Sequence, residues 1–175
     1  MNAPIRLAGE ADAAAIASIY RPYVEESCIS FEEVAPCGGE IARRIGNAHY
    51  PWLVIEDASG LLGFASTSAM RARPAYRWSV ESGIYLVPEA QGRGWGRKLL
   101  AGHVELLERQ GFVTVLANIA LPNQASVALH EKCGFALAGV ERGVGFKLGR
   151  WVDVGRWQRD LAPRSAAPVE PRAPA

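Results

Sequence analysis

The glycine-rich segment Gln91-Gly-Arg-Gly-Trp-Gly96 is the feature that most constrains what this chain can fold into. Residues 79–87 before it have strand length and end in the apolar run Ile-Tyr-Leu-Val, and residues 94–110 after it carry apolar side chains at helical spacing. Glycine permits positive φ and close approach of the backbone to a ligand, and free N–H groups at a helix start bind anions. A strand, a bare loop and a helix in this order leave two readings open: a phosphate site, or a flexible turn with a solvated basic face.

Two nucleotide-binding templates fit this segment poorly. A P-loop needs Lys and then Ser or Thr after its last glycine, whereas Arg97 and Lys98 follow Gly96. A dinucleotide fingerprint needs G-x-G-x-x-G in the first strand–helix turn, whereas these glycines alternate with other residues and come late in the chain. The segment therefore predicts neither kind of nucleotide site.

Hydrophobic periodicity along the chain predicts the element order β-α-α-β-β-β-α-β-α-β-β, which is typical of one α/β domain on a mixed sheet. Asn123 is a candidate N-cap for the last helix. From residue 162 the sequence is "APRSAAPVEPRAPA", which predicts a disordered tail. We therefore expect a single domain over residues 1–161 and a tail over residues 162–175. The expected strands are residues 5–7, 51–57, 61–69, 79–87 and 112–120, with two more around Leu148-Gly149, and the expected helices are residues 10–27, 39–48, 94–110 and 123–134.

The composition narrows the class of protein. The 175 residues are 49% hydrophobic and 21% charged with a formal net charge of +1, so no global basic field is available for nucleic acid or an anionic membrane. We expect no secretory leader and no membrane span, because no apolar run has the required length or flanks. The three cysteines form no CxxC pair, which argues against a disulfide framework or a zinc site and favours the cytoplasm.

The motif Gln91-x-x-Gly94-x-Gly96 is followed later in the chain by Asn123-Gln-Ala-Ser126 and by Leu129-His130-Glu-Lys-Cys-Gly134-Phe135. Together these segments resemble the CoA-binding segments of the GNAT superfamily of N-acetyltransferases. Over roughly residues 5–161 the chain resembles, more narrowly, the phosphinothricin and methionine sulfone/sulfoximine N-acetyltransferases, through segments such as "RARPAYRWSVES" and "GVGFKLGRWVDVGRWQ". The resemblance implies the GNAT fold, an α/β (α+β layered) architecture. Its mixed, mostly antiparallel sheet of about seven strands is flanked by helices, and a splayed strand pair holds acetyl-CoA. The motif residues are Gln91, Gly94 and Gly96, then Asn123, Ser126, Leu129, His130, Gly134 and Phe135.

The resemblance also assigns residues to acetyl-CoA, without any metal. Amides of the glycine loop would hold the pyrophosphate, and the backbone of the preceding strand would pair with the pantetheine arm. Two positions depart from the family pattern: Trp95 stands where leucine is common, and Gly83 where threonine is more usual. The residues predicted to bind the cofactor are Ile84, Tyr85, Leu86, Gln91, Gly92, Arg93, Gly94, Trp95, Gly96, Arg97, Asn123 and Ser126.

One basic, aromatic loop is the predicted acceptor site. Guanidinium groups suit the carboxylate and the phosphinate or sulfone oxygens of such substrates, although a solvated basic loop is the usual alternative. The position of Arg71, Arg73 and Tyr76 within the matched segment is what implies, through the resemblance, that they bind the acceptor. The resemblance adds Phe31, although packing alone could explain that ring. The predicted substrate-binding residues are Phe31, Arg71, Arg73, Tyr76, Glu81 and Ser82.

Glu81 and His130 are the predicted catalytic residues. An amine must lose a proton before it attacks a thioester, and a nearby carboxylate such as Glu81 can accept it. The alternative for Glu81 is an ion pair, for example with Arg73. His130 stands where many GNAT members carry a tyrosine that protonates the departing thiolate, so it could be an acid, a base or a structural residue.

These residues predict an acyltransferase that acetylates the α-amine of L-phosphinothricin, L-methionine sulfoximine or L-methionine sulfone. We expect direct transfer in a ternary complex, because no base is spaced to activate Cys133 as a nucleophile. The expected partners are acetyl-CoA, a small amino-acid substrate and a second copy of the chain, with no nucleic acid and no membrane. Two alternatives stay open: acetylation of proteins or peptides, and a non-catalytic acyl-CoA-binding domain.

Overall fold

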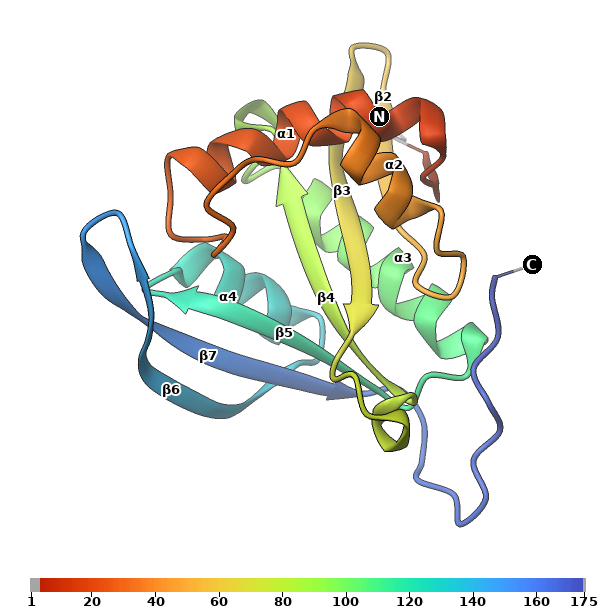
Figure 1. Ribbon diagram of the computed structural model, residues 1–175. Coiled ribbons are helices and arrows are strands. Elements are labelled where there is room, and N and C mark those ends of the chain that lie inside the picture. The colour runs from red at the N-terminus through yellow and green to blue at the C-terminus, as the bar shows by residue number, and fades with distance from the viewer. Residues whose placement is uncertain (1–3, 175) are drawn as a thin grey trace.

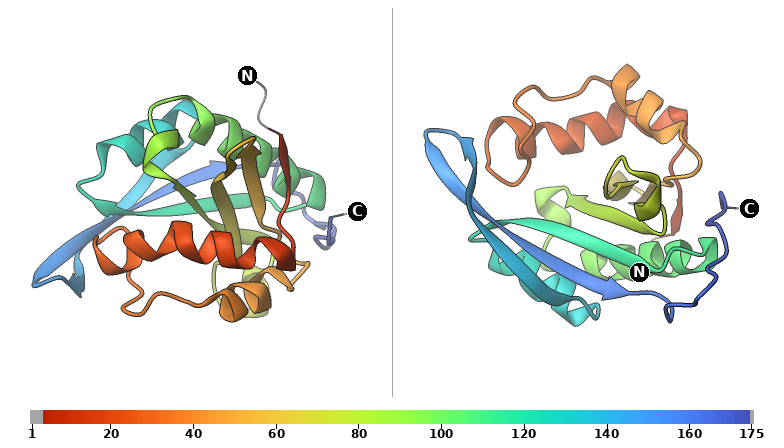
Figure 2. Two further views of the ribbon diagram at one scale, coloured as in Figure 1. Left: turned by 90° about the horizontal axis from the view of Figure 1, so that it is seen from above. Right: turned by 60° about the horizontal axis from the view of Figure 1, so that its bottom comes forward.

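A mixed sheet runs through the molecule with helices on both faces (Figures 1 and 2). The computed structural model describes residues 4–174, and within them the seven strands follow the order β1-β2-β3-β4-β5-β7-β6. Neighbouring strands are antiparallel except β4 and β5, which are parallel. The strands are β1 (Ile5–Leu7), β2 (Leu53–Asp57), β3 (Gly60–Ala69), β4 (Ser79–Leu86), β5 (Thr114–Leu121), β6 (Ala136–Lys147) and β7 (Arg150–Asp160).

The helices lie in two pairs on opposite faces of the sheet (Figure 2). Helices α1 (Ala13–Glu25) and α2 (Gly38–Ile45) cover one face, and α3 (Trp95–Gln110) and α4 (Gln124–Lys132) cover the other. Short 3-10 turns stand at η1 (Glu10–Asp12), η2 (Pro74–Tyr76) and η3 (Pro88–Ala90). The predicted element order and fold class are confirmed, with bounds that shift by a few residues.

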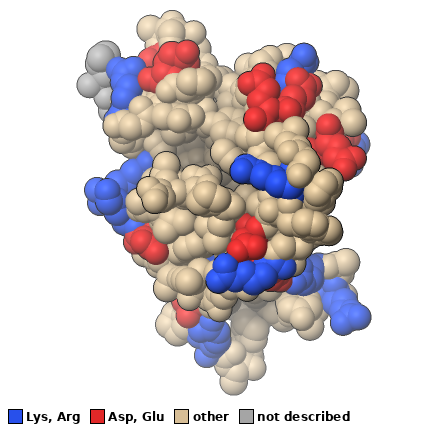
Figure 3. All heavy atoms as spheres, turned by 90° about the vertical axis from the view of Figure 1, so that its left-hand side faces the viewer, with Lys and Arg blue, Asp and Glu red and all other residues tan. Residues whose placement is uncertain are grey.

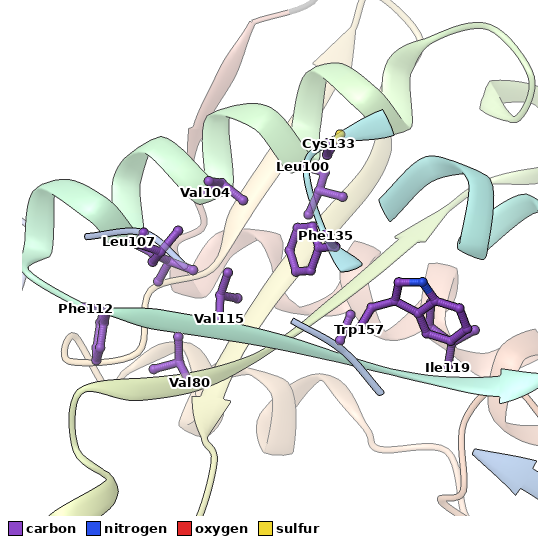
Figure 4. Close-up of a cluster of buried hydrophobic side chains, with 12 residues drawn as sticks. Val80, Leu100, Val104, Leu107, Phe112, Val115, Ile119, Cys133, Phe135 and Trp157 are labelled. Atoms are coloured by element: carbon purple, nitrogen blue, oxygen red, sulfur yellow. The ribbon is translucent and has the colours of Figure 1, made fainter. Parts of the chain in front are cut away.

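Apolar clusters on the two faces fix this arrangement. Between the sheet and helices α3 and α4, side chains such as Leu100, Val115 and Phe135 pack together in one cluster (Figure 4). Under α1 and α2, Ile16 and Phe64 belong to a second cluster. Burial of one such side chain stabilises the fold by about 2 kcal/mol, so each helix is held mainly by its apolar face.

The segment after β7 contains no helix or strand within residues 162–174, yet part of it lies against the domain. The indole N–H of Trp78 donates to the carbonyl of Val169 at 2.9 Å, and Arg77 forms an ion pair with Glu170 at 2.7 Å. These contacts differ from the disorder that the Ala/Pro/Arg composition predicts. The contacts are made by the backbone carbonyl of Val169 and the carboxylate of Glu170, and amino-acid composition does not indicate that these two groups find partners in the domain. The domain boundary after residue 161 stays a prediction.

Candidate active site

Strands β4 and β5 pair at one end and separate toward the other (Figure 1). Their parallel pairing joins residues 79–81 to residues 114–116 and stops at Glu81, although β4 continues to Leu86 and β5 to Leu121. Beyond Glu81 the facing edges of these strands have no strand partner among the described residues. The backbone N–H and C=O groups on these edges are therefore available to a ligand, except those of Leu86, which bond to the hydroxyl of Tyr23.

A small cavity of about 40 Å³, the cleft cavity, lies in this opening. Gly83 and Tyr85 line it from β4, and Asn123, Ser126 and His130 line it from α4 and its N-cap. Residues that the sequence assigns to the cofactor and to catalysis, from two separate motifs, thus meet at one cavity.

The glycine loop between β4 and α3 has the backbone that its sequence requires. Gly92 and Gly94 adopt φ of 69° and 83°, the left-handed region that favours glycine, and a Cβ at either position would meet open space. Gly96 serves packing instead, because a Cβ there would lie 3.2 Å from Cδ1 of Leu86. Helix α3 begins directly after Gly94, so the free N–H groups of its first turn border the exposed loop.

Gln91 holds this loop to α1. Its side-chain amide donates to the hydroxyl of Tyr23 at 3.1 Å, and that hydroxyl donates to the carbonyl of Leu86 at 2.5 Å. The side chain of Gln91 is therefore engaged within the chain, and the sequence did not single out Tyr23.

The ring of Trp95 packs inward rather than over the loop. It lies against a cluster that includes Ile55 and Leu99, with the ammonium of Lys98 5.9 Å from its ring centroid. Arg93 and Arg97 are exposed on either side. The aromatic residue at this position therefore extends the apolar contact of α3 with the sheet and leaves the basic groups at the surface.

Helix α4 presents His130 to the cleft cavity in one tautomer. Asn123 caps the helix as predicted, with its side-chain oxygen accepting from the N–H of Ser126 at 3.1 Å. Nδ1 of His130 lies 2.8 Å from the carbonyl oxygen of Ser126, so it carries the hydrogen and donates. Nε2 then holds a lone pair, and this buried atom has no partner within residues 4–174. Burial lowers the pKa of the imidazole below its ordinary value, which favours the neutral ring.

Glu81 projects from β4 toward α1 and α2. Successive strand residues face opposite sides of a sheet. Val80 packs into the α3 cluster, and the hydroxyl of Ser82 lies 3.1 Å from Nδ1 of His103 on α3. Glu81, between them, faces the other side, together with Tyr85. No ion pair joins Glu81 to another side chain in the described part of the chain. The structure therefore lacks the ion pair, for example with Arg73, that was the alternative to a catalytic role.

A larger cavity of about 440 Å³, the β3 cavity, lies between β3 and the two helices of this face. Ser66 and Ser68 of β3 line it, and Glu32 and Arg44 close its polar side. Tyr85 lines both cavities.

The predicted acceptor residues are not gathered around one cavity. Arg71, Arg73 and Tyr76 are exposed in the loop after β3, and they line neither cavity. Phe31 is 42% exposed and its ring lies against the backbone of Gly145. Of the six predicted residues, Ser82 lines the cleft cavity, but its hydroxyl is used by His103.

Neither the surface charge nor a cluster of metal-ligating side chains points to a further site in residues 4–174. On the face drawn in Figure 3, basic and acidic side chains are interspersed, in keeping with the small net charge. Residues 4–174 contain no group of three His, Cys, Asp or Glu side chains that could hold a metal ion. Across the same residues, every helix is too short or too polar to cross a membrane.

The chain belongs to the GNAT acetyltransferases, since the model of the acetyltransferase (GNAT) domain matches residues 5–155. It is 39% identical over 170 residues to a phosphinothricin N-acetyltransferase of Streptomyces viridochromogenes, covering 95% of this chain and 93% of the relative. It is 35% identical over 175 residues to an L-methionine sulfoximine/L-methionine sulfone acetyltransferase of Pseudomonas aeruginosa, covering 96% and 100%.

A solved structure agrees with this assignment. A GNAT superfamily phosphinothricin acetyltransferase from Sinorhizobium meliloti, in complex with acetyl-CoA, matches with a TM-score of 0.90 at 40% identity, covering 97% of this chain and 95% of the other. The predicted family, fold and enzyme class, an N-acetyltransferase, are confirmed. The prediction of acetyl-CoA as co-substrate agrees with the bound ligand of that relative.

Proposed function

We propose that this enzyme acetylates the α-amine of L-phosphinothricin, L-methionine sulfoximine or L-methionine sulfone. The activities named for its relatives, phosphinothricin N-acetyltransferase and methionine sulfoximine/sulfone acetyltransferase, support this class of acceptor. The observation that carries the proposal is the position of Glu81, which stands where β4 and β5 separate and makes no ion pair within the described residues. A free carboxylate at the head of the opening is suited to receive a proton from an amine placed there.

Acetyl-CoA supplies a thioester carbonyl for attack. The edge of β4 at Ile84 and Tyr85, which has no strand partner there, fits a pantetheine arm, and Asn123 and Ser126 border the same opening. Leu86 stays a proposed cofactor residue, and its backbone N–H and C=O are bonded to the hydroxyl of Tyr23. The bare backbone of Gly92 and Gly94 fits a pyrophosphate at the start of α3, with Arg93 and Arg97 as nearby cations. Gln91, Trp95 and Gly96 support this loop through their packing and hydrogen bonds.

In the proposed reaction, the amine nitrogen bonds to the acetyl carbon and the carbon–sulfur bond breaks. One amine proton leaves through Glu81 to water, and another ends on the sulfur of CoA. His130 acts through the lone pair on Nε2, accepting a hydrogen bond from the amine and orienting it. A neutral ring whose Nδ1–H is engaged by Ser126 suits that role better than proton donation to the thiolate.

Arg71, Arg73, Tyr76 and Phe31 stay proposed acceptor-binding residues. Their exposed groups sit in the loops that border the face of Glu81, and two guanidinium groups suit an anionic or strongly polar acceptor tip. Ser82 is proposed to position this part of β4 through the hydrogen bond between its hydroxyl and Nδ1 of His103.

The proposed assembly is a cytoplasmic homodimer. Exposed apolar side chains on the β6–β7 hairpin support it: Phe146, Leu148 and Trp151 are 58%, 58% and 69% exposed. Light scattering after size exclusion should give twice the chain mass, and Trp151→Glu should shift the species toward monomer. A monomeric wild type would contradict this part of the proposal.

The activity is tested by thiol release. Purified protein is mixed with acetyl-CoA and each of the three acceptors, and free CoA is followed with a thiol reagent. Release above the no-acceptor background is expected with at least one acceptor, and fragmentation in a mass spectrometer should place the acetyl group on the α-nitrogen. Background release with all three contradicts the proposed substrate class.

A further inference from the structure

The β3 cavity has no role in the reaction proposed above, yet it has the size of a ligand site. Its volume of about 440 Å³ falls in the range typical of small-molecule pockets. A phosphinate or sulfone tip that is held by the exposed arginine loop does not fill it.

The cavity adjoins the proposed base through the register of β3 and β4. Ser68 pairs with Glu81, and Ser66 pairs with Gly83. Both serines line the β3 cavity, whereas Gly83 lines the cleft cavity. Side chains that are directly opposite in an antiparallel pair lie about 5 Å apart. The two cavities therefore adjoin across the pairs Ser66–Gly83 and Thr67–Ser82, beside Glu81.

The absence of a side chain at Gly83 leaves space where the β3 cavity and the cleft cavity adjoin. A Cβ at position 83 would lie 2.9 Å from the hydroxyl oxygen of Ser66 and 3.1 Å from Cε2 of Tyr85. The ring of Tyr85 thus folds back over the bare backbone of Gly83. Any side chain there would displace Tyr85 or Ser66, and Ser66 lines the β3 cavity.

The walls of the cavity favour a planar apolar group. The ring of Phe64 stacks with Trp52 at 5.5 Å and with Tyr85 at 5.1 Å, and all three line the space. An aromatic group buried against such rings is stabilised by apolar contact and ring packing.

The polar side of the cavity is electrically balanced. Arg44 makes two hydrogen bonds to the carboxylate of Glu32, at 2.8 and 3.0 Å, and Arg43 is paired with Glu40 at 2.7 Å. Because each guanidinium already faces a carboxylate, this wall offers little net attraction to a second anion. An uncharged side chain suits it better than an anionic one.

We propose that the β3 cavity is a side-chain compartment of the acceptor site and that it admits α-amino acids with an aromatic side chain. Gly83 is its specificity-determining residue. The inference rests on the proposed function, because the amine must reach Glu81 while the ring enters the cavity.

The test compares L-phenylalanine with L-methionine sulfone as acceptors for wild type, Gly83→Ala and Gly83→Thr. Gly139→Ala is the matched control, since a Cβ at that exposed strand glycine meets nothing within 4 Å. Wild type should acetylate both acceptors. Gly83→Ala should lower kcat/KM for L-phenylalanine by about tenfold or more, and that for L-methionine sulfone by less than about threefold, as expected when a pocket is narrowed by one methyl group.

Two outcomes overturn the inference while the proposed function stands: acetylation of the sulfone but not of L-phenylalanine, or equal losses for both acceptors in Gly83→Ala. If no acceptor is acetylated, the proposed function fails, and calorimetry with L-phenylalanine then decides the inference separately. Binding that Gly83→Ala weakens and Gly139→Ala does not would support the compartment, and absence of binding would overturn it.

Discussion

The ammonium nitrogen of Lys147 lies 2.6 Å from the carbonyl oxygen of Ser30, a residue 117 positions earlier in the chain. The same nitrogen donates to the carbonyls of Val24 at 2.5 Å and Glu32 at 2.7 Å, so all three of its hydrogens are used. The tip of the β6–β7 hairpin thereby holds the loop after α1 (Figure 1). That loop supplies Ile29 to the cleft cavity and Glu32 to the β3 cavity.

Lys147→Met should therefore weaken acceptor binding. Three carbonyls would lose a charged donor, at a cost of about 2 kcal/mol or more, and the loop would become less ordered. We expect KM for the acceptor to rise by about tenfold, with KM for acetyl-CoA little changed, in steady-state kinetics with each substrate varied. Arg142→Met, on the same hairpin with an 80% exposed side chain, is the control. An unchanged acceptor KM in Lys147→Met would contradict the role of this contact.

Glu81→Gln should lower turnover, because an amide cannot accept the amine proton. A loss of about 10²–10⁴-fold in kcat is typical of a missing general base. Binding of acetyl-CoA, measured by calorimetry, should not change, and Glu105→Gln on the exposed side of α3 should behave as wild type. Normal kcat in Glu81→Gln removes this residue from the proton transfer.

The pH profile should separate the two roles open to His130. Its pKa is lowered by burial, so the ring is already neutral near pH 7. If Nε2 accepts a hydrogen bond, kcat should not fall as the pH is raised from about 5 to about 9. A proton-donating histidine would instead lose activity on deprotonation within or below that range. A falling limb that disappears in His130→Gln would contradict the acceptor role.

His103 should make stability depend on pH. The hydroxyl of Thr67 donates to the carbonyl of Pro51 and accepts from Nε2 of His103, while Nδ1 accepts from Ser82, so the ring is bound in its neutral form. Burial lowers its pKa from 6.5 to about 4. The unfolded chain then binds a proton more readily, and stability is lost as the pH falls from about 6.5 to about 4.

Full protonation corresponds to a loss of about 3 kcal/mol. Urea unfolding at pH 7 and pH 4 should show a smaller difference in free energy for His103→Gln than for wild type. An identical pH dependence in the two proteins would show that His103 does not titrate in this way.

Local features of the site follow from the sequence. Gly92 and Gly94 take the positive φ that their spacing suggests, and Asn123 caps α4 through its neighbour Ser126. The acceptor residues stay a prediction: Arg71 and Arg73 lie on an exposed loop and line neither cavity. Charge and motif position indicate which residue types suit a ligand. They do not predict the backbone conformation of the loop after β3, which decides where its arginine side chains lie.

The sequence by itself determined the order of the elements and the glycine loop before α3, because strand alternation, helical periodicity and glycine backbone freedom are local properties. The choice of Glu81 as the base came from the resemblance to the GNAT N-acetyltransferases and stays a prediction. Only the tertiary structure decided that β4 and β5 separate at Glu81, that Lys147 holds the loop after α1, and that Gly83 joins two cavities. These relationships bring together residues far apart in the chain. They depend on how sheet and helices pack, which no local pattern of residues specifies.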